Sequence, residues 1–260
     1  MSKTAEIARR ILDAYASGTT IAPVRGEITG VAEAYAVQRA TIEVWLGQGR
    51  KLIGHKIGLT SPAVQAQLGV GEPDFGALFA DMVVPDGAVV PKGRVLQPRI
   101  EGEIAFVLKS DLRGDRDGRI SPADVIAATD YVVPAIEICG SRIANWDIRI
   151  EDTIADDASS GLIVLSGQRS KPSLDALATI AMAVRPSDAE AVSGSGDACL
   201  GNPANAVAWL GEALLRFGGR LRAGDVVMSG ALAKMLPAAP GTSFTADFGA
   251  FGSVSVGFAP

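Results

Sequence analysis

Apolar residues recur at helical spacing in two segments at the start of the chain. The first segment covers Thr4–Ser17, and the second covers Val31–Leu46 and is followed by Gly47 and Gly49. A stripe with this period predicts an amphipathic helix, and glycines mark places where helices end. We therefore expect residues 1–50 to form an N-terminal helical cap.

From Lys51 onward the pattern changes to short apolar runs broken by Gly, Pro and Asp, which is typical of strands joined by turns. Two stretches predict helices instead, because Ser121-Pro122 and Asn202-Pro203 each place a proline directly after a good N-cap residue. Strand patterns occupy Arg99–Leu108, Tyr131–Ile138, the alternating Ile180, Met182 and Val184, Val226–Met228, Ser243–Phe248 and Ser253–Phe258. Helices and strands do not alternate regularly, so the sequence predicts an α+β fold with a mixed sheet, in which residues 51–260 form one compact, mostly β unit.

Charge and cysteine content exclude several classes of protein. The formal net charge of −5 comes without a cluster of Lys and Arg, which argues against nucleic-acid binding. No run of about 18 apolar residues occurs, and the amphipathic N-terminus differs from an export signal, so we expect neither a membrane-spanning helix nor secretion. Cys139 and Cys199 lie far apart and show no metal-binding or disulfide spacing. Reduced thiols in a cytoplasmic protein are the simplest interpretation.

Three glutamates are candidates for a metal site. Glu101 and Glu103 stand two positions apart in the predicted strand Arg99–Leu108, so their carboxylates point to the same side. A shared cation would remove their repulsion, and oxygen-only ligands favour a hard ion such as Mg²⁺ or Mn²⁺. The solvent-facing side of an edge strand is the commoner explanation for such a pair when it is taken alone. Glu137, however, lies in an apolar run that is unsuited to a lone buried acid, and together the three could hold one ion.

Other residues could contribute chemistry, although each has an ordinary explanation too. Lys56 is flanked by glycines, and near a metal it could pair with a substrate carboxylate or move protons, whereas most lysines are simply exposed. Asp74 lies in a turn-rich loop, where aspartate usually only stabilises the turn. His55 is the single histidine, which excludes a multi-histidine zinc site, and we interpret it as structural. The run Ala155–Gly161 supplies hydroxyls that suit an anion or a water, and Cys139 is interpreted as a small buried apolar residue.

Five motifs, in the same order along the chain, resemble those of the 2-keto-4-pentenoate hydratase and 4-oxalocrotonate decarboxylase family, within the fumarylacetoacetate hydrolase superfamily. They are Gly54–Ser61, Glu72–Gly76, Leu96–Ala105, Pro134–Glu137 with Gly140–Arg142, and Ala155–Ser159. The resemblance runs from about residue 4 to the C-terminus. It implies that residues 51–260 form a catalytic domain, a fumarylacetoacetate hydrolase-like mixed β-sheet roll behind the helical cap, and that the chain assembles into homo-oligomers.

The resemblance also implies the parts of an active site. It implies proton transfer near Lys56 and Asp74, with Ser159 close to a small 2-keto acid substrate, and an ion, Mg²⁺ or Mn²⁺, bound by Glu101, Glu103 and Glu137. This sequence departs from the family's pattern at two positions. Gly102 stands where relatives often have alanine, and Asp157 stands where asparagine is common.

Within the family, Leu200–Asn205 and Ser229–Leu232 are more similar to the hydratases than to the decarboxylases. The resemblance therefore implies a hydro-lyase of aromatic-compound catabolism that adds water to 2-hydroxypenta-2,4-dienoate to give 4-hydroxy-2-oxopentanoate. A decarboxylase of 2-oxo dicarboxylates would use the same metal chemistry and is the first alternative. A C–C bond hydrolase of the superfamily and a non-enzymatic partner subunit are the others.

Overall fold

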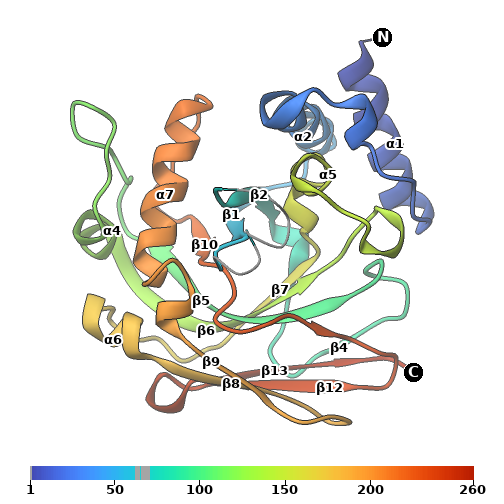
Figure 1. The fold of residues 1–260 in the computed structure, drawn as a ribbon. Coiled ribbons are helices and arrows are strands. Elements are labelled where there is room, and N and C mark those ends of the chain that lie inside the picture. The colour runs from blue at the N-terminus through green and yellow to red at the C-terminus, as the bar shows by residue number, and fades with distance from the viewer. Residues whose placement is uncertain (1, 62–64, 66–70) are drawn as a thin grey trace.

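The computed structural model describes residues 2–61, 65 and 71–260, and these residues form two stacked β-sheets with helices around them. Figure 1 shows the larger sheet curling beneath the helices, with the smaller sheet below it. Within the described residues, no helix is long and apolar enough to cross a membrane. Two mixed sheets and an N-terminal pair of helices confirm the α+β prediction.

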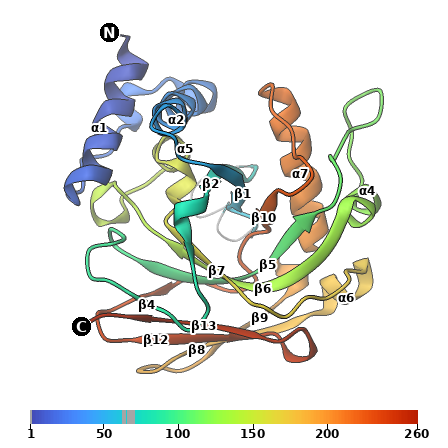
Figure 2. The ribbon, with the colours of Figure 1, turned by 180° about the vertical axis from the view of Figure 1, so that it is seen from behind.

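The N-terminal pair consists of α1 (Lys3–Ser17) and α2 (Gly30–Gly47), which pack on each other above one end of the larger sheet (Figures 1 and 2). The Ser2 hydroxyl caps α1 by accepting a hydrogen bond from the Ala5 N–H at 3.2 Å. Gly18 ends the helix in the left-handed conformation, with φ of 66°. Both helices match the predicted segments to within a residue at each end.

The larger sheet has the strand order β2, β1, β10, β5, β6, β7 and β3, with β11 also pairing with β5. Its longest pairing joins β5 and β6, which run antiparallel along their whole lengths. Bounds of the strands are β1 Leu52–Gly58, β2 Asp74–Phe79, β3 Val83–Val84, β5 Arg99–Leu108, β6 Thr129–Cys139, β7 Leu162–Leu165, β10 Val226–Met228 and β11 Leu236–Pro237. Parallel pairs, β1 with β10 and β3 with β7, stand among antiparallel ones, so the sheet is mixed as predicted.

The smaller sheet packs against the back of β5 and β6, in the order β4, β13, β12, β8 and β9. Its strands are β4 Val89–Val90, β8 Ala181–Pro186, β9 Val192–Ser195, β12 Ser243–Asp247 and β13 Ser253–Phe258. The two sheets are in close contact at Gly102, where a Cβ atom would come within 2.9 Å of Met182 Sδ and 3.0 Å of a Val184 methyl group. The side of β5 opposite its glutamates is therefore filled by the second sheet.

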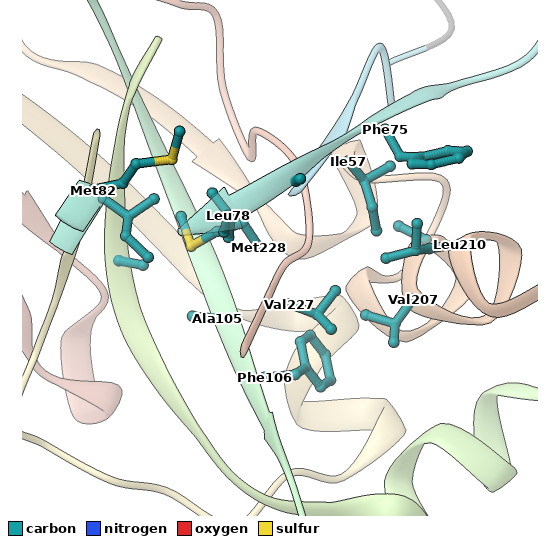
Figure 3. Packing of buried hydrophobic residues seen from close by; sticks show 14 of the residues in the cluster. Ile57, Phe75, Leu78, Met82, Ala105, Phe106, Val207, Leu210, Val227 and Met228 are labelled. Atoms are coloured by element: carbon teal, nitrogen blue, oxygen red, sulfur yellow. The ribbon is translucent and has the colours of Figure 1, made fainter. Parts of the chain in front are cut away.

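In the part of the chain that the structure describes, four further α-helices flank the sheets, and the longest of them, α7, packs on β1 and α4. Their bounds are α4 Pro122–Ala128, α5 Ile150–Ala155, α6 Leu174–Thr179 and α7 Pro203–Arg216. Asn202 and Ser121 cap α7 and α4 through their side chains, as predicted. Figure 3 shows Val207 and Leu210 of α7 in one apolar layer with side chains from β1, β2 and β10, namely Ile57, Phe75 and Val227. This layer fixes the strands that carry Lys56 and Asp74.

One local prediction was wrong. Asp74 was expected in a turn-rich loop, yet it is the first residue of β2 and is buried. Strand β2 pairs antiparallel with β1, and Gly58 lies opposite Asp74 in that pairing. The apolar side chains that follow Asp74 extend the strand into the core, and this tertiary contact overrides the local turn preference of the sequence.

Candidate active site

Strands β5 and β6 bring the three glutamates to one face of the larger sheet. Glu101 stands directly opposite Glu137 in the antiparallel register, and Glu103 follows two residues farther along β5. Side chains two positions apart share a face, so all three carboxylates point away from the second sheet. Glu103 and Glu137 are 0% and 1% exposed, and Glu101 is partly exposed. The three glutamates expected to act together thus share one face of the sheet, with Glu101 and Glu137 directly opposite each other.

Several of these carboxylate oxygens have no hydrogen-bond donor within the described residues. Glu103 Oε2 accepts a hydrogen bond from the Gly230 N–H at 2.8 Å, but Glu103 Oε1 accepts none, and neither oxygen of Glu137 does. Burial, together with repulsion from Glu137, raises the pKa of Glu101 to about 7 and raises the pKa of Glu103 well above its ordinary value. Buried acids without donors destabilise a fold unless a cation satisfies them. A set of carboxylate oxygens fits a hard divalent ion.

Lys56 lies beside this cluster on β1. Its Nζ is 3.2 Å from Glu137 Oε1 and donates a hydrogen bond to the carbonyl oxygen of Ala158 at 2.8 Å. Burial alone would lower the pKa of Lys56, but the negative charges led by Glu137 raise it well above the ordinary value. Lys56 is therefore an ammonium group that offsets part of the negative charge of the glutamates.

Asp74 and Ser159 are joined through a third side chain, Thr153 of α5. The Thr153 hydroxyl donates a hydrogen bond to Asp74 Oδ2 at 3.1 Å, and its oxygen lies 3.2 Å from Ser159 Oγ. Since Thr153 has a single hydroxyl proton, Ser159 is the donor to Thr153. Asp74 Oδ1 and Lys56 Nζ both lie beside Gly58, because a methyl group there would overlap the first and come within 3.4 Å of the second. Asp74 and Ser159 are therefore linked through Thr153, and Asp74 is a neighbour of Lys56.

The turn that carries Ser159, η4 (Asp157–Ser159), has an uncommon backbone. Asp157, Ala158 and Ser159 have φ values of 53°, 51° and 55°, and left-handed residues other than glycine each cost roughly 1–2 kcal/mol. The Asp157 carboxylate holds the turn by accepting a hydrogen bond from the Ala77 N–H at 2.8 Å. Gly76 lets the turn approach β2, because any Cβ there would overlap the Asp157 carbonyl. The strained turn thereby aims the Ala158 carbonyl at Lys56.

Sequence reasoning missed the residues that support this turn. Arg142 is 2% exposed and pairs with Asp156, and it donates hydrogen bonds to the carbonyl oxygens of Asp156 and Ser160, each at 2.8 Å. The Tyr15 ring of α1 covers its guanidinium at 4.0 Å. Arg142 belongs to one of the motifs named above, but nothing in its local sequence indicated a role. Thr153 gave no local signal either.

His55 and Cys139 complete the surroundings. Strand alternation turns His55 away from Lys56 and the glutamates, toward Phe75, whose ring centre is 6.4 Å away. Burial lowers the pKa of His55 to about 4, so it is neutral, in line with the structural role expected for it. Cys139 is buried as expected, yet its Sγ lies 3.5 Å from Glu101 Oε2. Burial and the charges of Glu101 and Glu137 raise the pKa of the Cys139 thiol well above its ordinary value.

Comparison with known proteins gives consistent matches. The family profile described as fumarylacetoacetate (FAA) hydrolase C-terminal matches residues 51–257. A 2-keto-4-pentenoate hydratase of Dechloromonas aromatica is 48% identical over 95% of this chain and 93% of its own, and the TodF product hydratase of Pseudomonas putida F1 is 50% identical over 96% and 92%. The solved structure of 4-oxalocrotonate decarboxylase from Pseudomonas putida G7, complexed with magnesium and adipate, has a TM-score of 0.91 at 35% identity, covering 98% of this chain and 97% of that one.

Proposed function

This chain belongs to the fumarylacetoacetate hydrolase family, and from that premise we propose that it is a hydro-lyase that adds water to 2-keto-4-pentenoate in aromatic-compound catabolism. The substrate enters as its enol, 2-hydroxypenta-2,4-dienoate, and the product is 4-hydroxy-2-oxopentanoate. One observation carries the assignment of the site: three carboxylates share one face of the larger sheet, two of them are buried with oxygens that accept no hydrogen bond within the described residues, and Lys56 Nζ lies 3.2 Å from Glu137 Oε1.

Glu101, Glu103 and Glu137 are proposed to hold a divalent cation, Mg²⁺ or Mn²⁺. When bound there, such an ion supplies a positive charge that binds the carboxylate and 2-oxygen of a keto acid and stabilises negative charge on that oxygen. A solved relative that is 35% identical is complexed with magnesium, which supports the choice of a hard divalent ion. Glu103 Oε1 and Glu137 Oε2 support it independently, because these buried oxygens accept no hydrogen bond within the described residues and a cation would satisfy them.

Lys56 and Asp74 are proposed to move the protons. One proton leaves the 2-hydroxyl as it becomes a carbonyl, and one is added at C5, which gives 2-oxopent-3-enoate. Water then adds across this electrophilic alkene, so that its hydroxyl group bonds to C4 and its other proton goes to C3. Burial raises the pKa of Asp74, although Lys56 and Thr153 oppose that shift, and a carboxyl group with a raised pKa is a better proton acceptor when ionised than an ordinary aspartate.

Ser159 is proposed to contact the substrate, because the left-handed turn places its hydroxyl next to the Thr153–Asp74 pair. Lys56, held by the Ala158 carbonyl and by Glu137, is proposed to offset the charge of the substrate carboxylate. Its ammonium group is desolvated, so its attraction for an anion is stronger than at the surface.

A decarboxylase of 2-oxo dicarboxylates is the second candidate, since the solved structure with a TM-score of 0.91 has that name. The two reactions share the stabilised 2-oxygen anion and differ in the bond that changes. The hydratase assignment is favoured because the relatives at 48% and 50% identity are hydratases, whereas the decarboxylase is 35% identical. Release of CO₂ from 4-oxalocrotonate, measured beside hydration of the pentadienoate, separates the two.

The test of the metal site uses Glu103→Gln, with Glu190→Gln as the matched control because Glu190 is exposed. Disappearance of the dienoate absorbance is followed in chelator, in Mg²⁺ and in Mn²⁺. We expect Glu190→Gln to behave as the unaltered protein, and Glu103→Gln to lose about 10²-fold or more in turnover, as when a single group that stabilises transition-state charge is removed. Full turnover in chelator would refute the proposal.

Three broader features are part of the same proposal. We propose that residues 1–50 act as a helical cap on a catalytic domain of residues 51–260, that the protein assembles into homo-oligomers, and that it works in the cytoplasm. Light scattering on the purified chain measures the assembly. Fractionation of cells that express it measures the location.

A further inference from the structure

Cys139 lies at the edge of the carboxylate cluster and is not used by the proposed reaction. It is 3% exposed and follows Glu137 by two positions on β6, so both side chains point to the same face. One oxygen of Glu101, one oxygen of Glu137 and the Sγ of Cys139 lie within 4.8 Å of one another. Three donor atoms at this separation can bind one ion with small side-chain adjustments.

A second observation points to a ligand at the same place. The Glu137 side chain is 1% exposed; its Oε1 is ion-paired with Lys56 Nζ at 3.2 Å, whereas its Oε2 accepts no hydrogen bond within the described residues. Glu103 stands apart from this group, because the Gly230 N–H holds its Oε2 at 2.8 Å. The cluster therefore contains two overlapping sets of donors: three carboxylates, or two carboxylates and one sulfur.

We propose that Glu101, Glu137 and Cys139 form a second site, selective for thiophilic divalent ions such as Zn²⁺ and Cd²⁺, that overlaps the Mg²⁺ or Mn²⁺ site and blocks hydration when it is filled. Its inhibitory consequence rests on the proposed function, whereas the binding itself does not. Sulfur is a soft donor that binds Zn²⁺ and Cd²⁺ well and Mg²⁺ poorly, whereas a site made of carboxylates alone favours hard ions.

Binding at this site is a simple ligand exchange without a redox step. The Cys139 S–H bond breaks, its proton leaves to solvent, and the sulfur lone pair bonds to the ion, so one proton is released for each ion bound. The ion then occupies Glu101 and Glu137, which the three-carboxylate site requires. A thiophilic ion consequently competes with Mg²⁺, and Glu103 is then not a ligand of the bound ion.

The chain offers a matched control for this inference, because Cys199 is its second cysteine, is also buried, and makes its hydrogen bond to the Ser229 carbonyl oxygen at 3.0 Å. Cd²⁺ is titrated into the chelator-treated full-length protein, and the near-ultraviolet charge-transfer absorption of Cd²⁺–thiolate bonds is recorded. We expect one Cd²⁺ per chain to give the band in the unaltered protein and in Cys199→Ser. In Cys139→Ser we expect the band to vanish and Cd²⁺ affinity to fall about tenfold or more, since losing even a supporting partner of a metal ligand costs that much.

The outcomes are decisive in both directions. Loss of the band in Cys199→Ser, its survival in Cys139→Ser, or its absence from the unaltered protein would each overturn the inference. Excess Mg²⁺ must also weaken the band, because the two sites share Glu101 and Glu137; a band that Mg²⁺ leaves unchanged rules out the overlap. X-ray absorption on the Zn²⁺ form adds a structural readout, since a Zn–S distance of about 2.3 Å differs from Zn–O distances of about 2.0–2.2 Å.

The variant Glu103→Gln separates this inference from the proposed function. Glu103 is outside the sulfur-containing set, so we expect the Cd²⁺ band to persist in Glu103→Gln while Mg²⁺-dependent turnover is lost. A protein that shows the band but no hydration of any dienoate would contradict the proposed function alone. A protein that hydrates the dienoate but shows no band would contradict the thiophilic site alone.

Discussion

The Thr153 hydroxyl links two residues of the candidate site, and its removal can be predicted in some detail. Thr153→Val keeps the size and branching of the side chain but deletes the donor to Asp74 Oδ2 at 3.1 Å and the oxygen 3.2 Å from Ser159 Oγ. Thr153 is 3% exposed, so water does not readily replace the lost partner. Hydrogen bonds to buried charged groups contribute about 1.5–3 kcal/mol, which corresponds to a decrease of about 10- to 100-fold in kcat/KM.

The pH profile distinguishes this positioning role from general damage to the fold. The Thr153 hydrogen bond lowers the pKa of Asp74, against the larger effect of burial, so its loss raises that pKa. If Asp74 must be ionised to accept a proton, the acid limb of kcat/KM moves to higher pH in Thr153→Val. The assay is dienoate consumption across pH with Mg²⁺ in excess, and Thr153→Ser, which restores the hydroxyl, should recover both rate and profile. If the acid limb of Thr153→Val is not shifted, the link between Thr153 and Asp74 is refuted, whatever the turnover rate of the variant.

Two further predictions concern stability, measured by urea unfolding at a series of pH values. Burial lowers the pKa of His55 to about 4 from 6.5, so the unfolded chain binds more protons than the folded chain below pH 6.5. The free energy of unfolding therefore falls by up to about 3 kcal/mol as the pH drops from 6.5 to 4. His55→Gln should flatten that part of the pH profile, and an unchanged slope would disprove the burial argument. Burial raises the pKa of Asp157 to about 7 from 3.8, so the folded chain binds more protons, and stability falls as pH rises from 4 to 7. Asp157→Asn, which keeps an acceptor for the Ala77 N–H, should be more stable than the unaltered protein at pH 8 but not at pH 4, and equal stability at pH 8 would count against the prediction.

Local patterns in the sequence predicted the elements with strong periodicity. The alternation in Arg99–Leu108 gave that strand its observed bounds and placed Glu101 and Glu103 on one face. The position of Glu137 opposite Glu101 depends on the pairing register of β5 and β6, which no local pattern contains. The apolar surroundings of Glu137 indicated a partner, but only the folded sheet identifies it.

The remaining site residues lie beyond the reach of local patterns. The local sequence made Lys56 and Asp74 candidates with an ordinary explanation each, and only the family resemblance implied roles for them and for Ser159, because an isolated polar residue predicts no particular role. The turn at 157–159 is left-handed without a glycine, so the usual sequence signal of that conformation is missing. Short elements such as α5 (Ile150–Ala155) and β7 (Leu162–Leu165) are stabilised by neighbours far away in sequence and had no predicted bounds.

The stacking of Tyr15 on Arg142 has a practical consequence for N-terminal truncation of this protein. The family profile begins at residue 51, which invites expression of the matched segment without its first two helices. Such a truncation would uncover a guanidinium that holds the carbonyl groups of Asp156 and Ser160, on either side of the serine proposed to touch substrate. Water would then reach these hydrogen bonds from the side that α1 covers in the full chain. Activity measured on the shortened protein would therefore describe a less ordered site than the native one.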